Sequence, residues 1–169
     1  MPEIVLRPMR AADLPAVLAI QAQCYGDALV ESAHALESRL LLSPDFCWVA
    51  ALADRSLAGY LLTHAWPEAS LPPWNGHLTS DWDEDAALTW FVHDMAVAPA
   101  GQGTGVAGRL YDAARNRATA SGLTTSRLIA VQSAGDYWRR LGYVQAQAAG
   151  FSEKLAMYGA GALLMERRL

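Results

Sequence analysis

The sequence is poor in cysteine, with only Cys24 and Cys47 among 169 residues. Their spacing fits neither a metal site nor a redox motif, so we expect two reduced thiols and a cytoplasmic protein. No apolar run is long enough to cross a bilayer, and no signal peptide is visible, so no membrane partner is expected. Internal repeats, low-complexity tracts and linkers are also lacking, which predicts one domain over residues 1–169.

Basic residues are scarce in the first part of the chain. Residues 1–100 contain 4 Lys/Arg and 13 Asp/Glu, whereas residues 101–140 contain 6 Arg and 2 Asp. No basic stripe of the kind that nucleic acid requires is present, so no nucleic-acid partner is expected. The basic block suits an anionic ligand. The acidic block is either solvated surface charge or a feature that suits a cationic acceptor.

Residues 88–97 (LTWFVHDMAV) are typical of a central β-strand, because both alternating faces are apolar. His93 and Asp94 interrupt the pattern, and burying an ionisable group is costly unless the group is paired or used. Strict alternation directs these two side chains to opposite faces, with His93 on the side of Met95 and Val97. Alternation therefore predicts that His93 and Asp94 do not share a pocket.

A glycine-rich turn and an amphipathic helix follow this strand. Gly101, Gly103, Gly105 and Gly108 lie within eight residues, and apolar residues then recur at helical spacing as far as Ala118. Glycine permits tight turns and close approach of a ligand, and the first N–H groups of a helix are unpaired at the positive end of its dipole. The stretch therefore predicts a phosphate or pyrophosphate site.

Three types of phosphate loop compete for this stretch. A P-loop is excluded because the turn has no lysine. The dinucleotide pattern G-x-G-x-x-G is formally met, but it lies past mid-chain and lacks the expected acidic residue about 20 residues later. A nicotinamide-binding enzyme therefore stays as a weaker alternative, which predicts NAD binding without CoA binding.

A resemblance to a known family supports the third type of phosphate loop. Residues 97–110 (VAPAGQGTGVAGRL) resemble the acetyl-CoA loop of the GNAT N-acetyltransferase superfamily, because Gln102, Gly105 and Ala107 fill its pattern Gln/Arg-x-x-Gly-x-Gly/Ala. Further segments are similar to that family's first strand, its aromatic helix and its last strand: 4–14 (IVLRPMRAADL), 137–143 (YWRRLGY) and 163–169 (LLMERRL).

The resemblance implies an α/β (α+β) fold. We expect a single domain with a central mixed, mostly antiparallel twisted sheet of six to seven strands, flanked by about four helices. Strands are expected at 3–7, 46–53, 56–66, 88–97, 127–132, 142–148 and 162–168. Helices are expected from Asp13, at 31–42, after the glycine-rich turn and at 134–141, with loops at 21–30, 67–86 and 149–161.

The resemblance also implies acetyl-CoA as co-substrate. It assigns the pantetheine arm to the main chain of Met95, Ala96 and Val97. Backbone N–H groups of the glycine-rich turn would hold the diphosphate: Gln102, Gly103, Thr104, Gly105, Val106 and Ala107. His34, His64 and His77 show no ligand spacing, so no metal is expected.

The catalytic residues are less well defined by the pattern. His93 precedes the pantetheine segment and is either a general base or a buried core histidine; a free imidazole titrates near ~6.5. Many members of the family carry a tyrosine acid where this chain has Trp138, so the neighbouring Tyr137 is the substitute candidate. Tyr25 and Asp94 are candidates for substrate binding, each with a purely structural alternative.

The function implied by the resemblance is direct acetyl transfer to an amine. The acceptor is a small amine, an amino acid-like compound or a protein amine, and a homodimer is an open alternative to a monomer. A non-catalytic acyl-CoA-binding sensor is the alternative from a different class. The loop at 67–86 alternates tryptophans with carboxylates, which indicates either a cation-binding loop or a loop packed by its own tryptophans.

Overall fold

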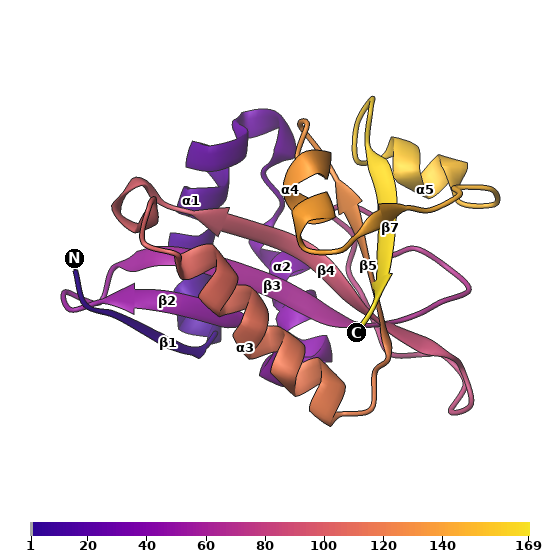
Figure 1. Ribbon diagram of the computed structural model, residues 1–169, viewed down its shortest axis with the longest axis horizontal. Helices are drawn as coiled ribbons and strands as arrows, with labels where there is room; N and C mark the ends of the chain where they lie inside the picture. The colour runs from indigo at the N-terminus through magenta and orange to yellow at the C-terminus, as the bar shows by residue number, and fades with distance from the viewer. Residues whose placement is uncertain (1) are drawn as a thin grey trace.

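A computed structural model describes residues 2–169. Seven strands form one sheet in the order β1-β2-β3-β4-β5-β7-β6 (Figure 1). Neighbouring strands are antiparallel except β4 and β5, which are parallel, so the expected mixed and mostly antiparallel sheet is confirmed. The strands are β1 (Ile4–Pro8), β2 (Trp48–Leu52), β3 (Leu57–Pro67), β4 (Leu88–Val97), β5 (Thr125–Ala130), β6 (Val144–Gln145) and β7 (Leu163–Arg168).

Helices cover both faces of the sheet. The long helix α3 lies across one face, and α1 and α2 lie behind the other (Figure 1). No helix within residues 2–169 is long and apolar enough to span a membrane. The α-helices are α1 (Leu14–Tyr25), α2 (Ala33–Leu42), α3 (Val106–Ala120), α4 (Gly135–Arg140) and α5 (Ser152–Ala156).

Helix α3 has the amphipathic character that its sequence predicts. Leu110, Tyr111, Ala114 and Ala118 are buried and pack against Trp90 and other residues of the sheet. Burial of such a face is the main source of stability for a helix in water. This packing fixes the position of the helix, and its N-terminus directly follows the glycine-rich turn after β4.

Several boundaries differ by one or two residues from the sequence-based expectation, and three elements differ by more. Helix α1 continues to Tyr25 instead of giving way to a loop at residue 21, and it ends at Gly26, whose φ of 76° suits glycine. The expected loop at 149–161 contains the short helix α5, which is too brief to show a helical period. Strand β6 has only two residues instead of seven.

Strand β4 contains a β-bulge. Leu62 of β3 pairs with Asp94, but its neighbour Thr63 pairs with Val92, so His93 is an extra residue without a partner. Such an insertion shifts the alternation of side chains by one position. As a result, His93 and Asp94 project to the same side, toward α1, and Met95 and Val97 pack on the side of α3. The expectation of opposite faces is therefore wrong.

Strands β4 and β5 pair over only part of their length. Trp90, Phe91 and Val92 pair with residues 126–128, and within residues 2–169 no later residue of β4 pairs with β5. The strands therefore separate beyond Val92. This separation leaves one edge of Met95–Val97 without a neighbouring strand, directly before the glycine-rich turn.

The start of the turn is tightly packed, which yields a stability prediction. A Cβ at Gly101 would lie 2.5 Å from the Ala58 carbonyl oxygen and 2.9 Å from Val97 Cγ1. Gly101→Ala should therefore lower the free energy of unfolding by ~1–3 kcal/mol, the usual cost of overpacking. Chemical denaturation measures this change.

The matched control is Gly108→Ala in α3, where an added Cβ would meet nothing within 4 Å. Alanine at an open helical position should raise stability by ~0.5–1 kcal/mol. Equal stability of Gly101→Ala and the wild type would contradict the close packing.

Candidate active site

The glycine-rich turn presents bare backbone to solvent. Gly103 and Gly105 have φ of 74° and 76°, a conformation that side-chain-bearing residues rarely adopt. A Cβ built at either residue would meet no atom within 4 Å, so the space above them is open. A ligand can therefore approach the main chain closely at both positions.

Several amide groups of this turn are available to a ligand. Within residues 2–169, the N–H groups of Gly103, Gly105, Val106 and Ala107 donate to no protein acceptor. By contrast, the Gln102 N–H donates to Pro99 O and the Thr104 N–H to Gly101 O, both at 3.3 Å, within the turn itself. The free donors converge at the N-terminus of α3, where an anion is favoured.

The open edge of β4 lies beside this turn. Ala98 N donates to Ala58 O of β3, so the alternate residues Met95 and Val97 direct their peptide groups to the other edge. The Tyr25 hydroxyl donates to Met95 O at 2.7 Å, and Cys24 Sγ lies 3.5 Å from Val97 O. The end of α1 thus contacts the edge where the sequence predicts pantetheine.

A pocket opens where β4 and β5 separate. It brings together four of the predicted residues, Tyr25, His93, Asp94 and Met95. Gln132 Nε2 donates to Tyr25 O at 3.1 Å and so connects the segment after β5 with the end of α1. Other lining residues come from α1, the loops beside α2, β5, α4 and the segment after α5, among them Gln21, Glu31, Trp74, Ile129, Trp138 and Tyr158.

His93 is paired with a carboxylate that sequence reasoning missed. His93 Nε2 lies 2.5 Å from Glu31 Oε1, and both side chains are 2% exposed. The other ring nitrogen, Nδ1, is buried and has no hydrogen-bond partner within residues 2–169. The Tyr158 ring stands edge-on to the imidazole at 6.4 Å. His93 is thus neither a fully satisfied core histidine nor a free surface group.

Glu31 is held in place by further donors. Its Oε2 accepts from Asn75 N at 3.1 Å, and its own N–H donates to Gln21 Oε1 at 2.8 Å. Burial alone would raise the pKa of Glu31, but His93, the Arg39 charge and the Asn75 N–H together lower it to about 2. The carboxylate is therefore ionised near neutral pH and acts only as an acceptor.

Asp94 is surrounded by neutral donors. Its Oδ2 accepts from Gln21 Nε2 at 2.8 Å and from the Tyr60 hydroxyl. Burial raises the pKa of Asp94, while His93, Tyr60 and Gln21 oppose that shift. No Lys or Arg within residues 2–169 forms an ion pair with Asp94, so its carboxyl group lacks a cation of the protein in direct contact.

A buried arginine lies behind this pocket. Arg39 is fully buried, with Nη1 2.7 Å from His64 Nε2 and Nη2 donating to Pro73 O at 2.8 Å. Because arginine only donates, His64 Nε2 accepts, and Nδ1 donates to Ala65 O at 2.9 Å. Burial and the Arg39 charge hold the pKa of His64 well below its usual range, so His64 is neutral.

The structure does not bring Tyr137 to the pocket. Trp138 lines the pocket, whereas Tyr137 packs edge-on against the Trp138 ring at 5.1 Å and beneath the Arg140 guanidinium. Burial raises the pKa of Tyr137. The acid role predicted for Tyr137 therefore has no geometric support.

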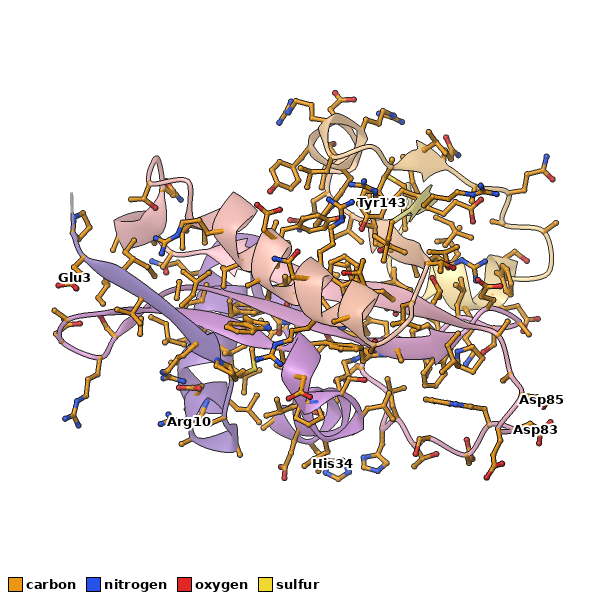
Figure 2. All side chains as sticks on the ribbon, turned by 60° about the horizontal axis from the view of Figure 1, so that its bottom comes forward. Glu3, Arg10, His34, Asp83, Asp85 and Tyr143 are labelled. Atoms are coloured by element: carbon orange, nitrogen blue, oxygen red, sulfur yellow. The ribbon has the colours of Figure 1, made fainter. Side chains whose placement is uncertain are left out.

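The loop at 67–86 is divided between two environments. Asp83 and Asp85 are exposed and point away from the molecule at its outer edge (Figure 2). Trp66 and Trp82 pack edge to face at 5.5 Å, which favours the interpretation of a loop packed by its own tryptophans. Trp74 alone among these residues lines the pocket.

Comparisons with known proteins agree with this architecture. A family model described as "Acetyltransferase (GNAT) family" matches residues 14–143. No curated protein sequence matches the chain. Within residues 2–169, no group of three His, Cys, Asp or Glu residues is arranged to hold a metal ion.

Three solved structures illustrate the shared fold. Ard1 from Thermoplasma volcanium has a TM-score of 0.71 and 15% identity, with 98% of this chain and 97% of that chain covered. The loading GNATL domain of CurA from Lyngbya majuscula has a TM-score of 0.76 and 14% identity, with 98% of each chain covered. N-acetylglutamate synthase from Neisseria gonorrhoeae, solved with coenzyme A and N-acetyl-glutamate, has a TM-score of 0.74 and 16% identity, with 100% of this chain and 36% of that chain covered.

The chain therefore belongs to the acetyltransferase (GNAT) family. The bare amide groups of Gly103, Gly105, Val106 and Ala107 fit an anionic cofactor such as coenzyme A.

The turn yields a binding prediction. Gly105→Glu places a carboxylate at the N-terminus of α3, where it repels a diphosphate. We expect the Kd for acetyl-CoA to rise on the order of 100-fold, the effect of two like charges a few ångströms apart near a protein surface. Isothermal titration calorimetry measures the change, with circular dichroism as the check on folding.

Two control variants separate the effect of the added charge at the turn from the effect of the altered backbone. Asn116→Glu adds the same charge to an exposed position of α3, about 16 Å along the helix, and should leave the Kd unchanged. Gly105→Ala introduces the unfavourable φ without the charge and should have the smaller effect. Tight binding by Gly105→Glu would show that the diphosphate lies elsewhere.

Proposed function

We propose that this protein is an N-acetyltransferase that transfers the acetyl group of acetyl-CoA directly to a cationic amine. The observation that carries the proposal is the pocket itself. It joins the unpartnered Nδ1 of His93 and the Asp94 carboxylate to the open edge of β4. The proposal treats residues 1–169 as one domain, and the free thiols of Cys24 and Cys47 are consistent with action in the cytoplasm.

The chain has a distinct place for each part of the donor. The free amides of Gly103, Gly105, Val106 and Ala107 would hold the diphosphate, and the side chains of Gln102 and Thr104 flank them. The peptide groups of Met95 and Val97 at the open edge would pair with the pantetheine amides like an added strand, with Ala96 between them. Bound in this way, acetyl-CoA supplies an electrophilic thioester carbon at the pocket.

The charge of the pocket favours a cationic acceptor. The buried anion Glu31 is balanced by the nearby buried cation Arg39, whereas Asp94 is contacted only by neutral donors. An unbalanced buried carboxylate costs several kcal/mol, which a bound ammonium group would offset. Asp94 would therefore bind the ammonium, with the aromatic rings of Trp74 and Tyr25 beside it.

The proton balance follows from the acceptor. His93 Nδ1 takes one proton from the ammonium, which leaves an amine with a free lone pair. A C–N bond then forms at the thioester carbon, the C–S bond breaks, and the nitrogen's second proton goes to the departing thiolate. The products are an N-acetylated amine and CoA, with one proton left on His93 for release to solvent.

An amine panel tests this function. Release of CoA from acetyl-CoA should be fast with small cationic amines or N-terminal peptides and slow with neutral hydroxyl compounds, because Asp94 recognises the ammonium. A thiol-reactive dye measures the release. Tight CoA binding without turnover on any amine would instead favour the sensor, to which Trp138 at the usual tyrosine position already points.

Removal of the base should affect turnover much more than binding. His93→Ala should lower kcat by ~10²-fold or more, since a positioned general base contributes about that factor. The Kd for acetyl-CoA should stay within about twofold because the phosphate loop is untouched. Steady-state kinetics and calorimetry measure the two effects. An unchanged kcat with a lower melting temperature would make His93 a purely structural residue.

A further inference from the structure

We propose that Glu31 is the positioning residue of a Glu31–His93 pair in which Nδ1 of His93 is the nitrogen that accepts the substrate proton. Glu31 fixes the tautomer of the ring and stabilises the imidazolium that forms during the reaction. This inference rests on the proposed function and adds the residue that controls its base.

The geometry assigns the protons on the ring. An ionised carboxylate can only accept, so the short contact with Glu31 Oε1 requires a proton on His93 Nε2. A neutral imidazole has one N–H, so the lone pair of His93 lies on Nδ1. That atom is buried and unpartnered in a residue that lines the pocket. A substrate proton that reaches Nδ1 can therefore bind to this free lone pair.

Two further segments hold Glu31 in place, one through its carboxylate and one through its backbone N–H. Asn75 of the loop at 67–86 donates its N–H to Glu31 Oε2 and accepts from Ser32 N at 2.8 Å through its side-chain oxygen. Gln21 of α1 accepts from Glu31 N and donates to Asp94. The loop at 67–86 thus contributes to the site mainly by supporting Glu31, and the positive φ of Asn75, 55°, permits this turn.

Several charged and titratable groups face this pair. Glu31 is negative, Arg39 of α2 is positive and His64 of β3 is neutral, whereas burial raises the pKa of Asp94 of β4. Tyr158, beyond α5, keeps its proton because burial raises its pKa to about 12. Of these, only Glu31 contacts the imidazole at hydrogen-bonding distance, so its charge has the largest effect on the imidazolium.

Each proton is accounted for in the step. The acceptor's N–H bond breaks and a new N–H bond forms at His93 Nδ1, so the ring becomes a cation with protons on both nitrogens. Nε2–H keeps donating to the Glu31 carboxylate, which stays ionised. After transfer of the acetyl group, Nδ1 releases its proton to solvent through the open pocket, and the ring returns to its starting tautomer.

The test is Glu31→Gln, which keeps the shape and an accepting oxygen but removes the charge. We expect kcat to fall on the order of 10²-fold with little change in the KM for acetyl-CoA. Without the carboxylate the imidazolium is less stable, so the ring stays neutral to lower pH. The acidic limb of the kcat/KM profile should therefore move to lower pH. A merely structural role would lower the melting temperature and leave this limb in place.

A second measurement does not depend on turnover. Nitrogen-15 spectra of the histidine rings should show wild-type His93 with Nε2 protonated and Nδ1 bare at high pH. The pH at which the ring gains its second proton should be lower in Glu31→Gln. Glu37→Gln on the exposed side of α2 is the control and should change neither the kinetics nor the ring titration.

The outcomes separate this inference from the proposed function. An unchanged ring titration in Glu31→Gln, or a wild-type ring with its proton on Nδ1, overturns the inference. A wild type that acetylates no amine overturns the proposed function. In that case the ring titration still decides whether Glu31 controls the protonation of His93.

Discussion

One extra residue in β4 determines the chemistry of this cleft. A regular strand would direct either His93 or Asp94 under α3, into an apolar cluster around Trp90 and Leu110. An unpaired ionisable group there would cost several kcal/mol. The bulge at His93 avoids this cost, because it directs both side chains to the side of α1, where Gln21 and Glu31 meet them. An imidazole and a carboxyl group therefore share one pocket.

The same stretch of β4 separates two functions of the cleft. In the proposed function, its side chains at His93 and Asp94 would serve the acceptor, whereas its main chain at Met95 and Val97 would present an open edge to the donor. The edge is open because pairing with β5 ends at Val92. The glycine-rich turn follows within a few residues, so the proposed diphosphate site is attached to the same strand. One element would therefore position both the donor and the acceptor.

The sequence predicted the parts of the site that depend on local chemistry. The open glycine-rich turn, the amphipathic helix α3 and the central position of β4 each have a pattern within about fifteen residues. The bulge has no such sequence pattern, because neither glycine nor proline lies next to His93. Glu31 was missed for a different reason: it lies 62 residues from His93, and nothing beside the N-cap Ser32 distinguishes it from a surface acid. Contacts at such separation depend on tertiary packing.

The tryptophan at position 138 is consistent with acetyl transfer to an amine. An ammonium acceptor has three protons on nitrogen and the amide product has one, so two must leave. In the proposed reaction, His93 Nδ1 takes the first, and the departing thiolate takes the second. The reaction thus supplies its own acid, and no hydroxyl is required where Trp138 lines the pocket. The proposed reaction requires a base instead of an acid. A buried carboxylate such as Glu31, which would stabilise the cationic ring of His93, supports that role.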